Sequence, residues 1–344
     1  MGLFAPLSPP TTGRAIVLVA QAAYHLDELV PLRRELLARG HSADLVAPIP
    51  PRKPLNRFRP GVQRHLELVR NPVLKNISGE PERLDDLVSR SEAIVVMNDW
   101  GVCRLLIERA VDTGRPTIGW VEGVQDFDDV DTGRERRVYR RVDHVMCLGQ
   151  YGAERLAGTS RTVVGSERLR LLWELPVSSD PRASHVTINS NFTYGVYPEA
   201  RRPWVKSAVG SCREADIDFD ISRHSAERGL AFPHRVSSAP VSELLGRSSH
   251  LVTRFSTLGY EALVRGVAVV YHNPHHEQEP TFAPIAGALV RTSSRKDLCS
   301  ALAINSSGHA VREAAKAFLQ HHLELEAPVR PAQSAADVLE GFVR

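Results

Sequence analysis

The segment Leu251–Tyr271 constrains the fold of this chain more than any other. It reads LVTRFSTLGYEALVRGVAVVY, in which two apolar runs flank a stretch that suits a helix. Ser256 and Thr257 are favourable N-cap residues, so we expect a helix to follow them and to run to Arg265. Gly266 is expected to end that helix in the left-handed conformation, and the β-branched run after it suits a buried parallel strand. The segment therefore predicts a strand–helix–strand unit of an α/β protein.

The start of this predicted helix suits an anion. First-turn N–H groups lack partners inside a helix, and the helix dipole is positive there. Gly259 has no side chain to keep an anion away, and Thr257 and Glu261 share a helix face because they are four residues apart. A hydroxyl suits a phosphate and a carboxylate suits ribose hydroxyls, so a nucleotide diphosphate is the predicted ligand. The alternative is an ordinary capped helix without a ligand.

The same segment resembles the donor-binding segment of GT-B nucleotide-sugar glycosyltransferases and of the related UDP-GlcNAc 2-epimerases. Their pattern is roughly Ser/Thr-x-Gly-x-Glu-Ala-x-x-x-Gly-x-Pro-Val, and residues 256–269 read STLGYEALVRGVAV, with Ala268 where the family often has proline. The resemblance implies an α/β protein of the GT-B fold, with two Rossmann-like, doubly wound domains facing a central cleft. The donor-binding residues that it implies here are Ser256, Thr257, Gly259 and Glu261.

The length of 344 residues suits two domains. We predict a Rossmann-like acceptor domain over residues 1–175 and a Rossmann-like donor domain over residues 185–325, with a linker rich in proline and serine between them. Residues 164–169 partly match a segment near the domain junction of epimerase-like proteins, with Glu167 in place of proline. In GT-B proteins the last helices cross back to the first domain, so residues 326–344 are expected to pack there.

Composition excludes several other classes of protein. The net charge of +3 is too small to indicate nucleic-acid binding, although it fits an anionic ligand or a loose contact with a membrane surface. Four scattered cysteines without a C-x-x-C pattern indicate reduced thiols and not a disulfide or zinc framework. The sequence has neither a signal peptide nor an apolar run of the about 18 residues that span a bilayer. We therefore predict a cytoplasmic protein, with or without a peripheral contact at the inner membrane face.

Carboxylates follow three predicted strands of the N-terminal half. Asp27 comes after the strand at residues 15–20, and Asp99 and Glu122 each follow a later strand. Ligands bind at the carboxyl ends of strands in open α/β sheets, so each is a candidate general base for the acceptor hydroxyl. Glu122 ranks first, because related transferases carry Glu-Gly or His-Gly at this position, then Asp27, then Asp99. His25 is an alternative base, and the competing interpretation is that Asp27 caps a helix while His25 is solvated.

Polar residues at two strand ends of the C-terminal half are candidate contacts to the donor phosphates. Asn189 and Asn191 belong to an Asn-x-Asn-Phe ending that resembles surface-carbohydrate proteins, and Asx-turn chemistry is the alternative. Arg223 and His224 lie where related enzymes have Arg-x-His-Pro or Lys-x-His-Pro, and a cation there would neutralise the donor pyrophosphate. A capping or solvated role is the alternative for this pair.

Three loops have compositions that could suit a ligand. Residues 48–60 are basic and rich in proline, which suits an anionic acceptor or lipid headgroups, although a solvated connection is the more common role. The acidic residues of 126–131 lack the spacing of a calcium loop, so we interpret them as solvated. Residues 272–279 contain three histidines and two glutamates, but not in the order of a zinc helix. We expect that loop to contact the donor and no metal to be bound.

The resemblance implies a metal-independent transfer of a sugar from a nucleotide-sugar donor, such as a UDP- or CMP-sugar, to a hydroxyl group. The acceptor would be a glycan or lipid-linked molecule, in cell-surface polysaccharide or glycoconjugate biosynthesis. No separate cofactor is expected, because the nucleotide sugar is a substrate. Three alternatives stay open. They are a UDP-GlcNAc 2-epimerase-like isomerase or hydrolase, a CDP-glycerol glycerophosphotransferase, and a GT-B protein that binds a partner without catalysis.

Overall fold

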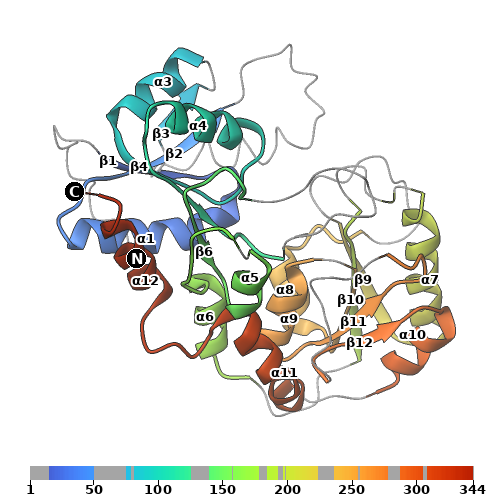
Figure 1. The fold of residues 1–344 in the computed structure, drawn as a ribbon. Coiled ribbons are helices and arrows are strands. Elements are labelled where there is room, and N and C mark those ends of the chain that lie inside the picture. The colour runs from blue at the N-terminus through green and yellow to red at the C-terminus, as the bar shows by residue number, and fades with distance from the viewer. Residues whose placement is uncertain are drawn as a thin grey trace.

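Two α/β units make up the computed structural model, and in each of them helices surround a parallel sheet (Figure 1). This arrangement confirms the prediction of two Rossmann-like, doubly wound domains. The residues that the structure describes are 15–49, 75–78, 81–124, 139–156, 158–177, 184–192, 197, 199–223, 236–254, 256–277, 287–304 and 308–343.

The N-terminal sheet has seven strands in the order β3-β2-β1-β4-β5-β6-β7. The chain builds outward from β1 to β3 and then returns to the other side of β1 with β4, so the order reverses between β1 and β4. The strands are β1 Ala15–Val19, β2 Ala43–Ile49, β3 Lys75–Ser78, β4 Ser91–Val96, β5 Thr117–Trp120, β6 His144–Cys147 and β7 Arg161–Val163. The helices are η1 Ala23–His25, α1 Leu26–Ala38, α3 Pro81–Arg90, α4 Gly101–Asp112, α5 Gln150–Arg155 and α6 Glu167–Glu174.

The C-terminal sheet has five strands in the order β12-β11-β10-β8-β9, with a reversal between β8 and β10. The strands are β8 His185–Ser190, β9 Asp218–Arg223, β10 His250–Thr253, β11 Ala268–His272 and β12 Val290–Thr292. The helices are α7 Arg201–Glu214, α8 Val241–Arg247, α9 Leu258–Val264, α10 Arg295–Leu302, α11 Gly308–Leu323 and α12 Pro331–Glu340.

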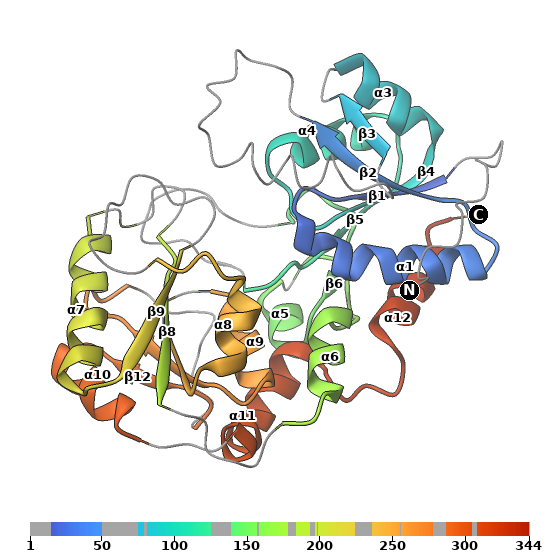
Figure 2. The ribbon, with the colours of Figure 1, turned by 180° about the vertical axis from the view of Figure 1, so that it is seen from behind.

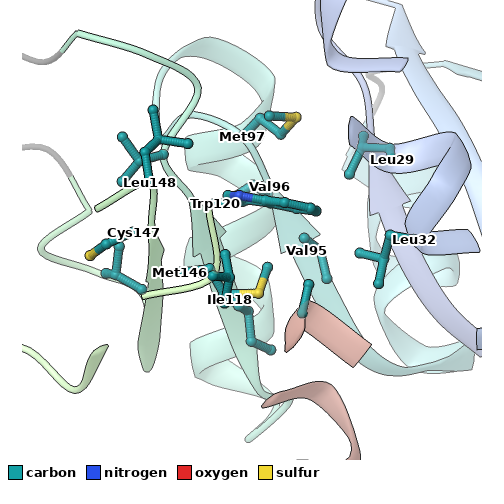
Figure 3. Packing of buried hydrophobic residues seen from close by; sticks show 14 of the residues in the cluster. Leu29, Leu32, Val95, Val96, Met97, Ile118, Trp120, Met146, Cys147 and Leu148 are labelled. Atoms are coloured by element: carbon teal, nitrogen blue, oxygen red, sulfur yellow. The ribbon is translucent and has the colours of Figure 1, made fainter. Parts of the chain in front are cut away.

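One hydrophobic core continues from the N-terminal sheet into the C-terminal unit. Trp120 of β5 is fully buried, and Figure 3 shows it beside Val96, with Leu29 and Leu32 of α1 to one side. The same core includes Tyr260 of α9 and much of α11, so the two units share apolar contacts and not only a linker. A second core fills the other face of the C-terminal sheet, under α7 and α10.

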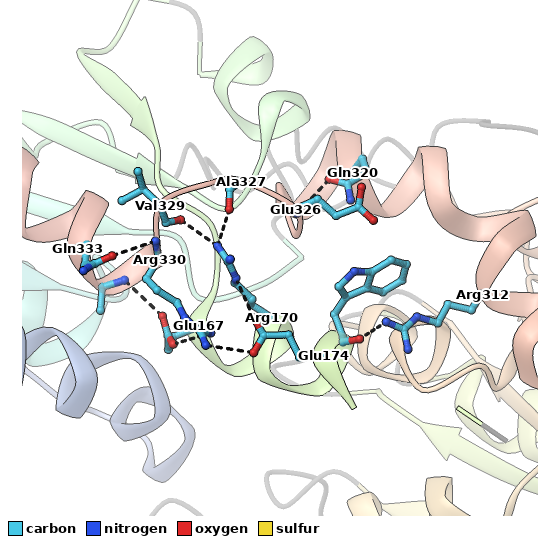
Figure 4. Close-up of polar contacts among 12 residues, drawn as sticks. Glu167, Arg170, Glu174, Arg312, Gln320, Glu326, Ala327, Val329, Arg330 and Gln333 are labelled. Atoms are coloured by element: carbon cyan, nitrogen blue, oxygen red, sulfur yellow. Dashed lines mark hydrogen bonds and ion pairs between the residues drawn. The ribbon is translucent and has the colours of Figure 1, made fainter. Parts of the chain in front are cut away.

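The end of the chain returns to the N-terminal unit. After α11 the chain crosses over, and α12 packs against α1, where Arg39 Nη1 pairs with Asp337 at 2.6 Å (Figures 1 and 2). The crossing segment is held to α6, because Arg170 Nη1 donates to the carbonyl oxygens of Ala327 at 2.8 Å and Val329 at 2.9 Å (Figure 4).

Candidate functional site

The loops after β1, β4 and β5 meet at one edge of the N-terminal sheet. These strands are parallel neighbours, so their carboxyl ends lie side by side. The strand order reverses between β1 and β4, and in open α/β sheets ligands bind at such a reversal. The predicted carboxylates Asp99 and Glu122 both belong to these loops, as does His25.

Glu122 is bonded to two side chains of the segment after β1. His25 Nε2 lies 2.6 Å from Glu122 Oε2, and the Tyr24 hydroxyl donates to the same oxygen at 2.8 Å. The His25 side chain is 1% exposed and that of Glu122 is 20% exposed, so the carboxylate, and not the imidazole, reaches solvent. The interpretation that His25 is solvated is therefore wrong, because the ring is enclosed and bonded to Glu122.

The hydrogen bonds of His25 define which ring nitrogen carries its proton. The backbone N–H of Gln21 donates to His25 Nδ1 at 3.2 Å, so this nitrogen is an acceptor. The proton of the neutral ring then sits on Nε2 and is donated to Glu122. Both ring nitrogens are thus in use, and His25 orients the Glu122 carboxylate.

The two other candidate bases have different surroundings. Asp27 lies in the first turn of α1. It does not cap this helix, because the N-cap residue is His25, and the His25 side chain makes no capping hydrogen bond. Burial raises the pKa of Asp27, Arg168 opposes that shift and Glu261 adds to it. Asp99 Oδ2 accepts the backbone N–H of Tyr139 at 2.7 Å. Burial raises the pKa of Asp99, while this hydrogen bond opposes the rise.

Helix α9 of the C-terminal unit meets the loop after β5 directly. The backbone N–H of Val124 donates to Thr257 Oγ1 at 3.0 Å. A Cβ added to Gly123 would lie 2.1 Å from the same Thr257 oxygen, so the approach requires a glycine there. Thr257, which we predicted to contact a phosphate, therefore bridges the two units right beside Glu122.

The first turn of α9 differs from the predicted anion site in one respect. Leu258 N–H donates to Ser256 Oγ at 3.2 Å, and Gly259 N–H donates to the Ser256 carbonyl oxygen at 3.0 Å. The prediction that these first-turn N–H groups are unpaired is therefore wrong, because a tight turn at Ser256 precedes the helix. The predicted left-handed end is confirmed, since Gly266 has φ +70°.

Glu261 lies at the boundary between the two units. Its Oε2 pairs with Arg168 Nη1 of α6 at 2.9 Å, and its Oε1 pairs with Arg265 Nε at 3.2 Å. Figure 2 shows α9 beside α6, in agreement with this bridge. Asp27 acts electrostatically on the same group, so Asp27, Arg168 and Glu261 form one cluster that is separate from the Glu122 pair. The ribose contact of Glu261 stays a prediction.

The predicted phosphate contacts lie at the carboxyl ends of β8 and β9. Asn189 is buried, and its Oδ1 accepts a hydrogen bond from Thr253 Oγ1 at 3.0 Å. Its side chain is therefore not exposed at this strand end. Asn191 follows β8, and its carbonyl oxygen accepts from Arg254 Nη1 at 2.8 Å. Arg223 ends β9 opposite Ser190 in the register. His224 lies outside the described residues.

The loop after β11 is built around a buried ion pair. Arg254 Nε donates to Glu277 Oε2 at 2.9 Å. Burial disfavours the charged carboxylate, but hydrogen bonds from His275 and Arg254 lower the pKa of Glu277 to about 2. The His272 ring is enclosed and hydrogen-bonded to Thr292 and Ser207, each at 2.9 Å. The prediction that the loop contacts the donor is therefore wrong for this residue.

Within the described ranges no group of three metal-ligating side chains is close enough to hold a metal ion. Over the same ranges no helix combines the length and the apolar character that a membrane crossing needs. The four cysteines are unpaired. Residues 48 and 49 of the predicted basic loop belong to β2, while residues 50–60 and the acidic run at 126–131 lie outside the described residues.

Arg168 was not predicted as a member of the site, Tyr24 was recognised only as part of the turn after the first strand, and Arg254 was left unassigned. A role for Arg254 could have been predicted, because an arginine directly after an apolar strand needs a buried partner. Tyr24 and Arg168 gave no such signal. Their partners are 98 and 93 residues away in the sequence, and only the fold brings them together.

The fold has well-matched counterparts among solved structures. A structure assigned as a UDP-N-acetylglucosamine 2-epimerase from Listeria monocytogenes gives a TM-score of 0.59 at 11% identity, covering 93% of this chain and 99% of that chain. Spinosyn rhamnosyltransferase SpnG, complexed with thymidine diphosphate, gives 0.55 at 16% identity, covering 95% and 100%. A variant of the wall teichoic acid polymerase TagF gives 0.58 at 11% identity, covering 95% and 88%.

The comparisons by sequence add no family to this result. No protein-family model and no curated protein sequence matches the chain. The similarity is therefore one of architecture, and it extends over nearly the whole chain in each case. This chain has the GT-B fold, in which two Rossmann-like domains face each other, as the sequence resemblance implied.

Proposed function

We propose that this protein is a glycosyltransferase that moves a sugar from a nucleotide-sugar donor to a hydroxyl group of an acceptor. The observation that carries the proposal is the Glu122 carboxylate, which His25 and Tyr24 hold beside α9 of the opposite domain. Two glycosyltransferases among the similar structures support this class. We further propose that the reaction belongs to cell-surface polysaccharide or glycoconjugate biosynthesis, in the cytoplasm or at the inner membrane face.

In the proposed reaction Glu122 is the general base. Its carboxylate accepts the proton of the acceptor hydroxyl while that oxygen forms a bond to the anomeric carbon of the donor. The bond from the anomeric carbon to the phosphate oxygen breaks, and the nucleotide leaves with the electron pair. His25 is a positioning residue, because its buried ring contacts Glu122 and not the substrate.

The leaving nucleotide gains negative charge that cations and hydrogen-bond donors must stabilise. We place these groups on the C-terminal domain, with Glu261 bonded to the ribose hydroxyls. Because protein groups stabilise the negative charge of the leaving nucleotide in this scheme, the reaction is metal-independent. The residues proposed to face the phosphates are Asn191, Arg223, His224, Ser256, Thr257 and Gly259.

A thermal-shift panel of UDP, dTDP, GDP, CDP and CMP, with and without Mg²⁺, tests the proposal. A ligand that binds only the native state raises the melting temperature. We expect one nucleotide to do so without Mg²⁺ and to identify the donor class. Turnover of the matching sugar nucleotide without an acceptor would instead favour the epimerase-like alternative. Transfer of glycerol phosphate would favour the CDP-glycerol alternative, and no shift with any nucleotide would contradict the glycosyltransferase.

Glu261→Ala is expected to weaken binding of that nucleotide by about tenfold or more, because a hydrogen bond to a charged group contributes about 1.5–3 kcal/mol. The measurement is nucleotide affinity by calorimetry. Glu261 also pairs with Arg168, so Arg168→Gln is the matched control, since it breaks the same ion pair and leaves the carboxylate. Equal affinities for the wild type and Glu261→Ala would remove Glu261 from the nucleotide site.

A further inference from the structure

The residue that follows β10 connects the loops on both sides of it. β10 lies between β8 and β11 in the sheet, and the three strands are parallel, so their carboxyl ends meet at one edge. Arg254 comes directly after β10. Its Nη1 donates to the carbonyl oxygen of Asn191, after β8, at 2.8 Å, and its Nε donates to Glu277, after β11, at 2.9 Å. One guanidinium group therefore bridges both loops.

Further contacts hold each loop to this guanidinium. The Arg254 guanidinium lies over the Phe192 ring, 4.7 Å from its centroid, so it contacts the loop after β8 at a side chain as well as at the backbone. On the other side, the Tyr271 hydroxyl donates to Glu277 Oε1 at 2.5 Å. Asn273 Oδ1 accepts the Glu277 N–H, and Asn273 Nδ2 donates to the Glu277 carbonyl oxygen, each at 2.8 Å. Both the carboxylate and the backbone of Glu277 are thus bonded within the protein.

The stability of the fold alone does not account for these two charges. The side chains of Arg254 and Glu277 are 6% and 3% exposed, so both charges are removed from water. An apolar pair of similar volume is often as stable as a buried ion pair, or more stable. A guanidinium group, in contrast, makes directed hydrogen bonds to two separate loops, which no apolar side chain can do.

The ion pair lies where this sheet is expected to bind a ligand. The strand order reverses between β8 and β10, and open α/β sheets bind ligands outside the carboxyl ends of their strands at such a reversal. The loop after β8 includes Asn191, one of the residues that we propose to face the donor phosphates. Arg254 is bonded to Glu277 and to the Asn191 backbone, so its charge is compensated within the protein.

We propose that Arg254 and Glu277 are positioning residues of the nucleotide site, whose ion pair fixes the loops after β8 and β11 in the arrangement that receives the donor phosphates. In this role neither side chain contacts the nucleotide. The inference rests on the proposed glycosyltransferase function, of which it names two residues that shape the donor site.

Glu277→Gln separates positioning from direct contact by the sign of its effect. The probe is whichever of UDP, dTDP, GDP, CDP and CMP stabilises the wild type in the thermal-shift panel, and calorimetry on the full chain gives its affinity. We expect the affinity to fall by about tenfold, because glutamine cannot form the charged pair in which both oxygens accept from Arg254. If Arg254 bound the phosphates itself, loss of its counter-charge would leave the affinity equal or raise it. That result would overturn the positioning role.

Asp220→Asn is the matched control for this variant. It also changes a carboxylate to an amide in the C-terminal domain, and it removes an ion pair with Arg247, whose Nη2 lies 2.5 Å from Asp220 Oδ2. Asp220 lies in the middle of β9 and bonds to His185 at the start of β8, away from the carboxyl edge of the sheet. We expect its nucleotide affinity to equal that of the wild type. Equal losses in Asp220→Asn and Glu277→Gln would overturn the specific role of the Arg254–Glu277 pair.

The double variant Arg254→Met/Glu277→Met separates positioning from a purely structural role. An apolar pair replaces both charges, so we expect a melting temperature close to that of the wild type. The Asn191 carbonyl oxygen loses its donor, so we expect the nucleotide affinity to stay reduced by about tenfold. Backbone hydrogen exchange is the second readout, and we expect it to be faster after β8 and β11 and unchanged within β10. If the double variant does not fold, the sign of the effect in Glu277→Gln still decides.

These outcomes separate the inference from the proposed function. A nucleotide that binds the wild type and the double variant equally well would keep the glycosyltransferase and overturn the positioning role. Hydrogen exchange that is unchanged after β8 and β11 would overturn that role as well. If no nucleotide binds the wild type, the glycosyltransferase is rejected, and with it the nucleotide site that the ion pair would position.

Discussion

Glu122→Gln is expected to reduce kcat by about 10²–10⁴-fold, which is the usual contribution of a general base. Glutamine keeps the size of the side chain and can still accept hydrogen bonds from His25 and Tyr24, so the local structure should persist. It cannot take the proton of the acceptor hydroxyl. The measurement is turnover at saturating donor and acceptor, together with the thermal shift that the donor nucleotide produces.

The nucleotide shift is the control within this experiment. We expect it to be unchanged in Glu122→Gln, because Glu122 belongs to the N-terminal domain and the proposed nucleotide site to the other. Asp99→Asn is a second control. Asp99 accepts a backbone N–H from Tyr139 and lies on the same sheet edge, but it is not the proposed base. Normal turnover in Glu122→Gln would move the base to Asp27 or Asp99.

Sequence reasoning could locate the sheet edge because the signals for it are local. Apolar runs that end in polar residues predicted β1, β4 and β5, and the loops after them contain Glu122 and Asp99. Parallel strands align their carboxyl ends, so the position of these carboxylates followed without any knowledge of tertiary contacts. The same reasoning predicted Gly266, where the end of a helix needs a left-handed residue.

Two short edge strands, β3 and β12, were not predictable in this way. β12 spans only Val290–Thr292 and has two exposed residues, so it lacks the alternation of buried and exposed positions that marks a strand in a sequence. β3 at Lys75–Ser78 follows a long stretch without a clear pattern and contains a lysine and an asparagine. Edge strands of this kind form because a neighbouring strand offers unpaired backbone groups, which is a tertiary effect.

The state of His25 shows the same limit at the site itself. Its neighbours in the sequence suggested a solvated residue near a helix start, but its partner Glu122 is 97 residues away. The Gln21 N–H that determines its tautomer depends on the backbone of the loop after β1. A histidine can therefore change from a solvated group to a buried positioning residue through contacts that no local pattern encodes.

Gly266→Ala is expected to cause the largest loss of stability of the substitutions considered. Gly266 ends α9 with φ +70°, a conformation that costs an alanine about 1–2 kcal/mol. In addition, the new Cβ would lie 2.3 Å from the carbonyl oxygen of Gly308 at the start of α11. That neighbour is backbone and cannot rotate away, so we expect a further loss of about 1–3 kcal/mol from overpacking.

Gly114→Ala is the matched control that separates these two costs. Gly114 follows α4 with φ +64°, and both glycines donate their N–H to the carbonyl oxygen three residues earlier, at 3.1 Å for Gly114 and 3.0 Å for Gly266. No atom lies within 4 Å of a Cβ added to Gly114, so this variant carries the conformational cost alone. Urea unfolding followed by circular dichroism gives both free energies. Equal losses would mean that α11 moves aside at no cost, and that the close approach of Gly266 to the Gly308 backbone adds nothing to the loss of stability.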